Sequence, residues 1–572
     1  MYILGLSCFY HDSSAALLRD GKIVAAAEEE RFTRKKHDSS FPLSAINYCL
    51  SSQGITINDI AYIGFYEKPF LKFERLLSQY LETFPKGLWS FVSTLPIWFS
   101  QKLRLIKIVR KKLKYKGSVL FVPHHLAHAA SAFLISPFQK AAILTIDGVG
   151  EWSTTTYGIG EENEIKLLKH LAFPHSLGLL YSAITAYLGF RVNNCEYKVM
   201  GLSAYGESDK DKNQYYKKLK NTIDIKADGS FCLDMDYFSY CFAQKMPSKK
   251  LCQLLGLPIR KASEELTQSH KDIAAALQTI TEEVIMKIIN HLHKEVACEN
   301  LVLAGGVALN SVCNGKILKN APFKNIWIQP NASDGGTSIG AISYIYNSLL
   351  GNARNYQMED AFLGPSFSNE EIKTFLDKEK ISYQFLGDSE LVEIGAKLIF
   401  ENKIIGWFQG RMEWGPRALG NRSILANPLN PEMKDILNSR IKHRESFRPF
   451  APAVCEESVS TYFECDSPLP EAARYMLLVY PIKEAWRSDL PAVTHFDGTG
   501  RLQAVNKDRN PLFYRLIEEF KALSGFSVIL NTSFNTNNEP IVCTPSEAWN
   551  CAKRAGLNYL AIGNFLIKLD EK

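Results

Sequence analysis

The chain has 572 residues, too many for one hydrophobic core, so its length predicts two to four domains. Its composition, 46% hydrophobic and 22% charged, is that of an ordinary globular protein. The net charge of +6, from 66 basic and 60 acidic side chains, is too small to indicate a nucleic-acid partner. The twelve cysteines form no Cys-x-x-Cys motif, which argues against a disulfide framework or a thiolate zinc site and predicts a cytoplasmic protein.

The first residues predict a strand rather than a signal peptide. An apolar run over residues 2–9 leads directly into the polar loop of His11 and Asp12, and Asp20-Gly21 favours a tight turn into a hairpin. The same plan recurs later, with a strand over 141–146, a loop over 147–150, and strands over 154–159 and 165–170 joined by a turn containing Gly160. We therefore expect an internal duplication of one sheet unit.

The segment 87–116 is aromatic in its first half and strongly basic in its second. It is too short, and too interrupted by Pro85 and Pro96, to span a bilayer. Three interpretations stay open: an interfacial segment, a wall of an apolar substrate pocket, or an amphipathic helical insertion packed on the domain or on a second subunit. The sequence favours the insertion.

His124 and His128 suggest a metal site. Two imidazoles four residues apart on a helix lie on one face, as metal binding requires. Asp147 ends the strand over 141–146, and Asp334 occupies a second predicted strand end, where α/β sheets place ligands. Two histidines with one or two carboxylates form an open mixed site that suits iron(II), manganese or magnesium better than structural zinc.

A long helix is predicted over 269–296 from apolar residues that recur every three or four positions. It leads into a strand that breaks at Gly305-Gly306, where a nucleotide could approach the backbone. Gly-Gly after a strand is more often only a turn, but its place between the duplicated loops and Asp334-Gly335 strengthens the nucleotide interpretation.

After a polar linker, the second half of the chain is rich in arginine. Residues 410–423 and 441–450 set basic side chains among glycine, proline and aromatic residues, and the strand over 528–530 opens into 531–535. Guanidinium groups in such loops match phosphate and carboxylate oxygens, whereas a solvated basic surface is the alternative. The aromatic neighbours favour an anion site.

These motifs resemble the O-carbamoyltransferase family typified by nodulation protein U and the carbamoyltransferases that tailor antibiotics. The resemblance covers nearly the whole chain, and its most specific segments are residues 9–15, 124–129, 198–202, 303–310, 417–423 and 447–452. It implies an α/β protein: residues 1–350 form a duplicated actin/sugar-kinase-like domain similar to threonylcarbamoyl transferases. Residues 351–367 form a linker, and residues 368–572 form a YrdC-like α/β domain.

The resemblance also implies a reaction. Carbamoyl phosphate and ATP would form carbamoyl adenylate and pyrophosphate in the C-terminal domain, and a hydroxyl of a small-molecule acceptor would attack the adenylate in the metal domain. The residues implied for carbamoyl phosphate and ATP are Arg417, Arg422, Lys442, Arg448, Asn531, Ser533 and Asn535. Those implied for the nucleotide at the metal domain are Gly148, Lys198, Gly305, Gly306, Asn310 and Gly335.

In this scheme His124, His128, Asp147 and Asp334 hold a divalent metal, iron(II) before manganese or magnesium, and ATP is a co-substrate. His11 beside Asp12 is the candidate base, although it could bind substrate or metal without moving a proton. The partners are carbamoyl phosphate, ATP and an alcohol such as a sugar or natural product. We expect neither nucleic acid nor a membrane span, and a homodimer is one candidate assembly.

Two other functions of the same fold compete with this one. A threonylcarbamoyl transferase acting on tRNA would need a broad basic face, which the near balance of charges argues against. A sugar kinase or actin-type ATP-binding regulator would leave the arginine-rich C-terminal motifs without a role. The sequence does not indicate which alcohol is the acceptor.

Overall fold

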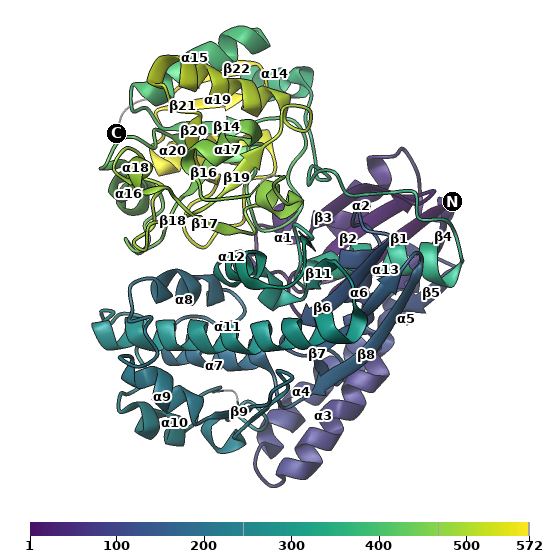
Figure 1. Ribbon diagram of the computed structural model, residues 1–572. Coiled ribbons are helices and arrows are strands. Elements are labelled where there is room, and N and C mark those ends of the chain that lie inside the picture. The colour runs from purple at the N-terminus through teal and green to yellow at the C-terminus, as the bar shows by residue number, and fades with distance from the viewer. Residues whose placement is uncertain (244, 467, 570–572) are drawn as a thin grey trace. The chain divides into compact units, whose positions relative to one another are not determined.

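A computed structural model describes residues 1–243, 245–466 and 468–569 and divides the chain into two compact units. Unit 1 comprises Met1–Ala26 and Ser39–Met358, and unit 2 comprises Ala27–Asp38 and Glu359–Lys572. The elements of each unit are labelled in Figure 1. Residues 351–367, expected to form a linker, contain no helix or strand. The boundary at 358 lies among them.

Unit 1 contains two five-stranded sheets with the same strand order. The first has the order β3-β2-β1-β4-β5 and the second β12-β11-β6-β7-β8. The two orders match when the second sheet is followed from β8 to β12. In each sheet three antiparallel strands then come first, and two strands parallel to the third follow. The strands are β1 (Tyr2–Ser7), β2 (Ser14–Arg19), β3 (Lys22–Glu28), β4 (Ile60–Phe65), β5 (Ser118–Phe121), β6 (Lys140–Ile146), β7 (Ser153–Glu161), β8 (Glu164–Ala172), β11 (Asn300–Ala304) and β12 (Asn325–Ile328). The predicted duplication of a sheet unit is confirmed.

Local sequence explains the hairpins. Asp20 and Gly21 both have positive φ, as a two-residue hairpin turn requires, and they connect β2 to β3, which are neighbours in the first sheet. The second hairpin differs from the prediction. Gly160 lies inside β7, and the turn falls at Glu162, whose positive φ supplies the bend, so the prediction of a turn containing Gly160 was wrong.

Two helices occupy equivalent positions in the duplicated plan. Helix α6 (His124–Phe133) follows β5, the last strand of the first sheet, and α13 (Thr337–Ser343) follows β12, the last strand of the second. They pack at very close range: a Cβ built on Gly340 of α13 would lie 1.8 Å from the Ala127 carbonyl oxygen of α6. Only glycine permits this approach, which brings the start of α6 near the turn before α13.

The other helices of unit 1 are inserted between these strands. The predicted helix over 269–296 is confirmed as α11 (Gln268–Val296). The other helices are α2 (Leu43–Ser51), α7 (Leu177–Tyr187), α8 (Glu196–Ser203), α9 (Gln214–Lys220), α10 (Lys249–Leu255) and α12 (Ser311–Asn320), and β9 (Ile223–Ile225) and β10 (Phe231–Leu233) form a small hairpin. Among the described residues, no helix is both long and apolar enough to cross a bilayer.

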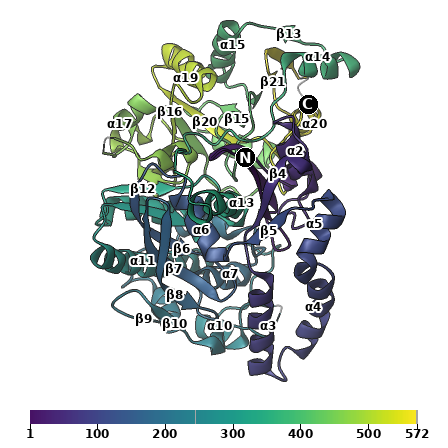
Figure 2. The ribbon, with the colours of Figure 1, turned by 90° about the vertical axis from the view of Figure 1, so that its right-hand side faces the viewer.

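The aromatic and basic segment folds as helices. Helix α3 (Pro69–Thr83) and helix α4 (Leu88–Ser100) lie side by side, as both views show (Figures 1 and 2), and α5 (Leu105–Leu113) follows. The facing sides of α3 and α4 pack through aromatic rings, with centroids of Phe73 and Trp98 5.6 Å apart and those of Tyr80 and Phe91 4.6 Å apart. The segment is a helical insertion between β4 and β5.

Unit 2 is built on one mixed eight-stranded sheet of order β13-β22-β21-β14-β15-β20-β16-β19. Its strands are β13 (Gln384–Phe385), β14 (Ile405–Phe408), β15 (Arg422–Ala426), β16 (Ala451–Cys455), β19 (Gln503–Val505), β20 (Val528–Ser533), β21 (Tyr559–Ile562) and β22 (Phe565–Lys568). Helices α15 (Asp388–Phe400) and α19 (Pro511–Ser524) contribute Leu391 and Phe513 to its core, around Trp407 of the sheet. The other two long helices are α14 (Asn369–Lys378) and α20 (Pro545–Ala555).

A short N-terminal segment belongs to unit 2, which the sequence did not predict. Residues 27–38 include helix α1 (Glu30–Thr33), whose Arg31 donates a hydrogen bond to the Gly415 carbonyl. Arg34 donates to the carbonyl oxygens of Pro540 and Ile541, each at 2.7 Å. The chain therefore passes between the two units more than once, because residues 39–358 return to unit 1.

Candidate metal centre and active site

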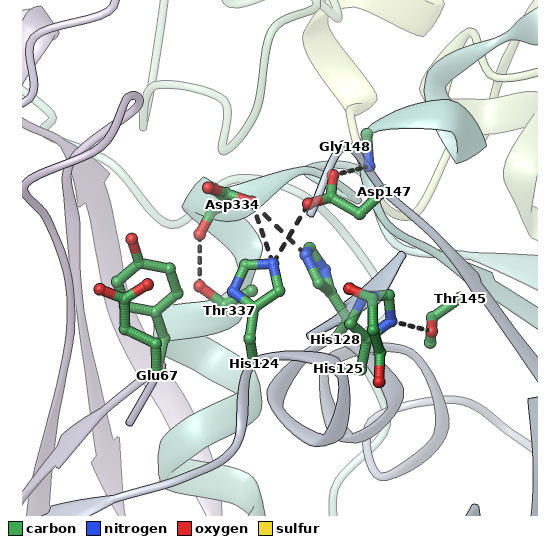
Figure 3. A network of polar contacts seen from close by, with 12 residues as sticks. Glu67, His124, His125, His128, Thr145, Asp147, Gly148, Asp334 and Thr337 are labelled. Atoms are coloured by element: carbon green, nitrogen blue, oxygen red, sulfur yellow. Dashed lines mark hydrogen bonds and ion pairs between the residues drawn. The ribbon is translucent and has the colours of Figure 1, made fainter. Parts of the chain in front are cut away.

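Four predicted metal ligands lie together in unit 1. His124 and His128 project from the first turns of α6, Asp147 follows β6, and Asp334 opens the short turn η5 (Asp334–Gly336) before α13 (Figure 3). Each residue offers one ligand atom, and these atoms all lie within 4.8 Å of one another. Asp334 lies six residues beyond the end of β12, so its predicted place at a strand end was inaccurate.

The distances within this cluster leave room for an ion. His124 Nε2 is 3.2 Å from Asp147 Oδ2 and 3.7 Å from Asp334 Oδ1, and His128 Nε2 is 3.5 Å from Asp334 Oδ1. All four residues are buried. Both carboxylate oxygens of Asp334 and both ring nitrogens of His128 are buried without a hydrogen-bond partner among the described residues. Buried polar atoms are normally satisfied, so the donor set fits a bound divalent cation.

The pKa shifts of the cluster also indicate that positive charge is favourable there. Burial raises the pKa of Asp334, but His11 and His124 lower it by more, so it lies below its ordinary value. Burial lowers the pKa of His124, yet its hydrogen bond to Asp147 and the charge of Asp334 raise it above the ordinary value. Protons on histidine thus neutralise the carboxylates when no metal is bound, and a metal would displace them.

The neighbouring His125 is excluded as a ligand. Its Nδ1 lies 2.7 Å from Thr145 Oγ1 and its Nε2 lies 2.9 Å from the Ser153 carbonyl oxygen, so both ring nitrogens are engaged. Burial and the neighbouring histidines lower its pKa to about 3. His125 is therefore a neutral residue that fixes α6 against β6 and β7.

Two supporting groups were not found by sequence reasoning. The buried Glu151 carboxylate accepts the backbone N–H groups of His124, at 3.0 Å, and Lys68, at 2.8 Å. It therefore holds the N-terminus of α6, where a negative charge is favourable. The Gly306 N–H donates to Asp147 Oδ1 at 3.0 Å and orients that carboxylate. Glu151 lies only four residues beyond Asp147, but no sequence pattern marked it.

His11 borders the cluster. Its Nδ1 lies 2.9 Å from Asp12 Oδ2, and its Nε2 lies 3.7 Å from Asp334 Oδ2. Burial lowers the pKa of His11, but the charges of Asp334 and Asp12 outweigh burial and raise it to about 10. The loop bends at Phe9 and Asp12, both with positive φ. Left-handed backbone at a bulky residue such as Phe9 is strained, as is common at functional sites.

Some of the predicted nucleotide residues lie at the metal cluster, and others have structural partners. Gly305 and Gly306 meet Asp147 at the end of β6, and a Cβ on Gly305 would lie 2.2 Å from the Ile146 carbonyl oxygen. The Gly335 carbonyl accepts the Ser14 hydroxyl, which ties η5 to the first sheet. Asn310 caps α12 and exchanges hydrogen bonds with Gln278, so part of its polar capacity is structural.

The remaining two predicted nucleotide residues, Gly148 and Lys198, have different surroundings. Gly148 follows the metal ligand Asp147 and leaves open space, with Leu179 the nearest neighbour of a Cβ there, at 3.9 Å. Lys198 lies on α8, with its Nζ 5.6 Å from the Phe190 ring. The loop after β6 and the turn after β11 therefore contain the residues that meet the metal cluster.

In unit 2 the structure brings together three of the predicted anion-binding residues. The buried Lys442 ammonium donates hydrogen bonds to the Ser533 carbonyl, and to the carbonyl and the side-chain oxygen of Asn535, at 2.8 and 2.9 Å. Burial, together with Arg444 and Arg448, holds the pKa of Lys442 well below its ordinary value. All three accepting oxygens are uncharged, so an anion would still stabilise this ammonium.

Two predicted residues of unit 2 have structural partners instead. Arg422 lies in β15, not in a loop, and its guanidinium donates to the carbonyl oxygens of Gln409, Asn421, Pro365 and Gly410. Asn531 lies within β20 and donates to Gln503 at 2.7 Å. Ser533 likewise ends β20, so the predicted loop over 531–535 begins only after it.

The family comparison identifies the class of protein. The model of the carbamoyltransferase N-terminus matches residues 2–343, and that of the carbamoyltransferase C-terminus matches residues 396–569. The chain therefore belongs to the carbamoyltransferase family and is an enzyme. The predicted resemblance is confirmed.

Named relatives agree with this assignment. Nodulation protein NolNO of Sinorhizobium fredii is 35% identical over 98% of this chain and 79% of its own length, and nodulation protein U of Rhizobium tropici is 26% identical over 92% and 89%. Protein sll1178 of Synechocystis sp. is 47% identical over 99% of this chain and 96% of its own. Component A of (R)-2-hydroxyglutaryl-CoA dehydratase from Acidaminococcus fermentans aligns with 60% of this chain and 97% of its own, at 17% identity and a TM-score of 0.33, too distant to define the fold.

Binding of a divalent cation should stabilise the protein through these four ligands. At a free metal concentration 100 times Kd, the linkage is worth about 2.7 kcal/mol, enough to raise Tm by a few degrees. We expect Fe²⁺ or Mn²⁺ to raise the Tm of the metal-free protein and to release protons on binding. His128→Ala and Asp334→Asn should lose both effects. His125→Gln is the matched control, since it should lower Tm but keep the metal response. An unchanged metal response in Asp334→Asn would contradict the site.

His11 should stabilise the metal-free protein in a pH-dependent manner. Its folded-state pKa, about 10, exceeds the ordinary value of 6.5. Its stabilisation is therefore fully present below pH 6.5 and is lost as the pH rises towards 10. In metal-free protein the Tm difference between the parent and His11→Asn should be largest at pH 6 and shrink at alkaline pH, measured by calorimetry. A difference that grows with pH would show that His11 is neutral when folded.

Proposed function

We propose that the protein is an ATP-dependent O-carbamoyltransferase that moves a carbamoyl group from carbamoyl phosphate to a hydroxyl of a small-molecule acceptor. The family assignment supports carbamoyl transfer. The observation that supports the metal-dependent step is the buried cluster of two histidines and two aspartates with unsatisfied ligand atoms.

The first step is assigned to unit 2, as the activation domain. Carbamoyl phosphate, ATP and one water would give carbamoyl adenylate, pyrophosphate and inorganic phosphate. Arg417 and Arg448 would bind phosphate oxygens, the buried charge of Lys442 would attract the anion without a further hydrogen bond, and Asn535 would bind the planar carbamoyl group. Arg422 and Asn531 would instead support these loops, because Arg422 donates to four carbonyl oxygens and Asn531 donates to Gln503.

The second step is assigned to unit 1, as the transfer domain. Gly148, Gly306 and Gly335 lie at the turns that adjoin the metal ligands, so they would leave room for the adenylate. A divalent cation held by the four ligands would polarise the adenylate phosphate as a Lewis acid. The acceptor hydroxyl would then attack the carbamoyl carbon and AMP would leave.

His11 is the proposed base for the acceptor hydroxyl. An imidazolium cannot accept a proton, and in the metal-free protein the pKa of His11 is about 10. A cation on Asp334 would neutralise the charge that raises the pKa of His11, which brings it towards the range useful to a base. His11 is therefore expected to work as a base only in the metal-loaded enzyme.

The reaction can be tested by supplying carbamoyl phosphate and ATP to the purified protein with a panel of alcohols. The proposal requires AMP and pyrophosphate in equal amounts and a carbamoylated alcohol detected by mass spectrometry. ADP formation without carbamoyl phosphate would indicate a kinase instead. Carbamoyl transfer to tRNA but to no small alcohol would support the threonylcarbamoyl transferase alternative.

The two steps should be separable by mutation. His128→Ala should abolish carbamoyl transfer while pyrophosphate release persists, because the ligand lies in unit 1. Arg448→Ala should slow pyrophosphate release by orders of magnitude, since an unpaired phosphate charge costs several kcal/mol, yet leave transfer from supplied carbamoyl adenylate intact. Loss of both activities in either folded variant would contradict two separate sites.

A further inference from the structure

A group of cations lies beside the His11 loop in unit 1. Lys72 and Arg75 are buried residues of α3, and Lys102 follows α4. The Nζ atoms of Lys72 and Lys102 lie 4.8 and 5.8 Å from the centre of the Tyr10 ring. That ring lies 4.7 Å from the ring of His11. The cations therefore border the proposed transfer site.

Arg75 is the unusual member of this group. It is only 5% exposed, and its Nε and Nη1 are buried without a hydrogen-bond partner among the described residues. Its guanidinium carbon lies 5.0 Å from the centre of the Phe173 ring. Burial lowers the pKa of Arg75. A guanidinium with unsatisfied buried donors is unfavourable unless a ligand anion completes it.

The carboxylates nearby are already engaged. Buried Glu67 pairs with Lys72 at 2.5 Å, and Glu151 accepts backbone N–H groups of α6 and Lys68. Neither Arg75 nor Lys102 has an ion pair with a carboxylate in the described part of the chain. Burial and the charge of Lys72 lower the pKa of Lys102 to about 8. The group therefore carries more positive than negative charge.

We propose that Arg75 and Lys102 bind an anionic group, a phosphate or carboxylate, on the acceptor alcohol. The inference rests on the proposed function, which needs an acceptor next to His11. Figure 3 shows Glu67, the partner of Lys72, on one side of His124, with Asp147 and Gly148 on the other. Since the adenylate is assigned to the glycine-containing loops near Asp147, the cations on the Glu67 side are left for the acceptor.

Stability distinguishes a ligand site from a structural ion pair. Without ligand, Arg75→Met should raise Tm, because it removes an unsatisfied buried charge. Arg260→Met is the matched control. Arg260 is 6% exposed and lies 5.1 Å from the Phe190 ring, but it donates hydrogen bonds to the carbonyl oxygens of Leu188 and Glu264. Arg260→Met should lower Tm, and a similar fall in Arg75→Met would overturn the proposal.

Kinetics identifies the source of the anion. Each alcohol of the panel is supplied in neutral form and as its phosphate or carboxylate, with carbamoyl adenylate as donor. In Arg75→Met the KM of the anionic alcohol should rise about tenfold or more, as loss of a charged contact predicts, with kcat and the neutral alcohol unaffected. A raised KM for carbamoyl adenylate instead would overturn the acceptor assignment. Absence of AMP formation by the parent would refute the proposed function itself.

A second observation concerns the exposed apolar side chains of the insertion formed by α3, α4 and α5. Of the 21 large hydrophobic residues that are exposed in the described chain, eleven fall between residues 70 and 106. They are Phe70, Leu71, Leu77, Leu81, Phe84, Leu88, Trp89, Val92, Ile97, Phe99 and Ile106. Trp89 is 85% exposed and Phe84 is 67% exposed. An apolar surface this concentrated usually marks an interaction site.

The charge of the insertion is equally uneven. Residues 69–116 contain eleven basic and two acidic side chains, a net +9, whereas the whole chain is +6 and the remainder is therefore −3. Most of the basic side chains lie on α5 and just after it, and those of Lys107, Arg110 and Lys111 are exposed. Exposed aromatic side chains on one helix of a segment whose next helix is basic are typical of interfacial membrane segments.

We infer that this insertion docks on the surface of an anionic lipid bilayer without crossing it. A second copy of the chain is a poorer occupant, because a symmetric contact would bring two copies of the exposed basic side chains of α5 together. An anionic bilayer satisfies both the apolar tip at Phe84 and Trp89 and the basic helix α5. The inference is independent of the carbamoyl acceptor.

Flotation with vesicles tests the docking. The protein should bind vesicles of phosphatidylcholine mixed with phosphatidylglycerol, an anionic lipid, and not vesicles of pure phosphatidylcholine. Phe84→Ser/Trp89→Ser and Lys107→Gln/Lys111→Gln should each reduce binding about tenfold. Phe496→Ser, at a residue 69% exposed in unit 2, is the apolar control, and Lys294→Gln/Lys319→Gln is the basic control. A dimer that dissociates in Phe84→Ser/Trp89→Ser, without vesicle binding by the parent, would overturn the inference.

Discussion

The charge balance of one buried cluster governs the chemistry of unit 1. Asp147 and Asp334 lie in the interior, where an uncompensated carboxylate is very unfavourable, so positive charge must accompany them. Without metal the raised pKa of His124 supplies it as a proton. A divalent cation supplies it better, because it also satisfies the open ligand atoms of His128. Metal binding and the stability of unit 1 are therefore coupled equilibria, so that a bound metal raises the free energy of unfolding.

The duplication explains how that cluster is assembled. The loops after β1 and β6 are equivalent in the two sheets, and one contributes His11 while the other contributes Asp147. The segments after β5 and β12 are also equivalent, and they contribute the histidines of α6 and Asp334. One fold repeated twice therefore brings four different segments to one place. The close approach at Gly340 fixes the spacing between α6 and α13, and with it the distance from His128 to Asp334.

Local patterns predicted much of this arrangement. The hairpin at Asp20-Gly21 and the long helix α11 follow from turn chemistry and periodicity, and the His124–His128 spacing needs only a helix. What could not be predicted depends on tertiary contacts. Sequence alone does not reveal that Arg422 donates hydrogen bonds to carbonyl oxygens of residues as distant as Pro365. Nor does it reveal that residues 27–38 belong to unit 2, because the dense charge of this segment does not indicate which core it packs against.

Arg75 and Arg260 are two equally buried arginines that we expect to have opposite effects on stability. Both guanidinium groups are buried and both lie near a phenylalanine ring, yet only Arg260 has its donors satisfied by carbonyl oxygens. A satisfied buried arginine stabilises the fold, whereas an unsatisfied one costs stability until a ligand binds. Because folding alone does not recover that cost, the burial of Arg75 close enough to Tyr10 to interact electrostatically with it is best explained by an anion that arrives with the substrate.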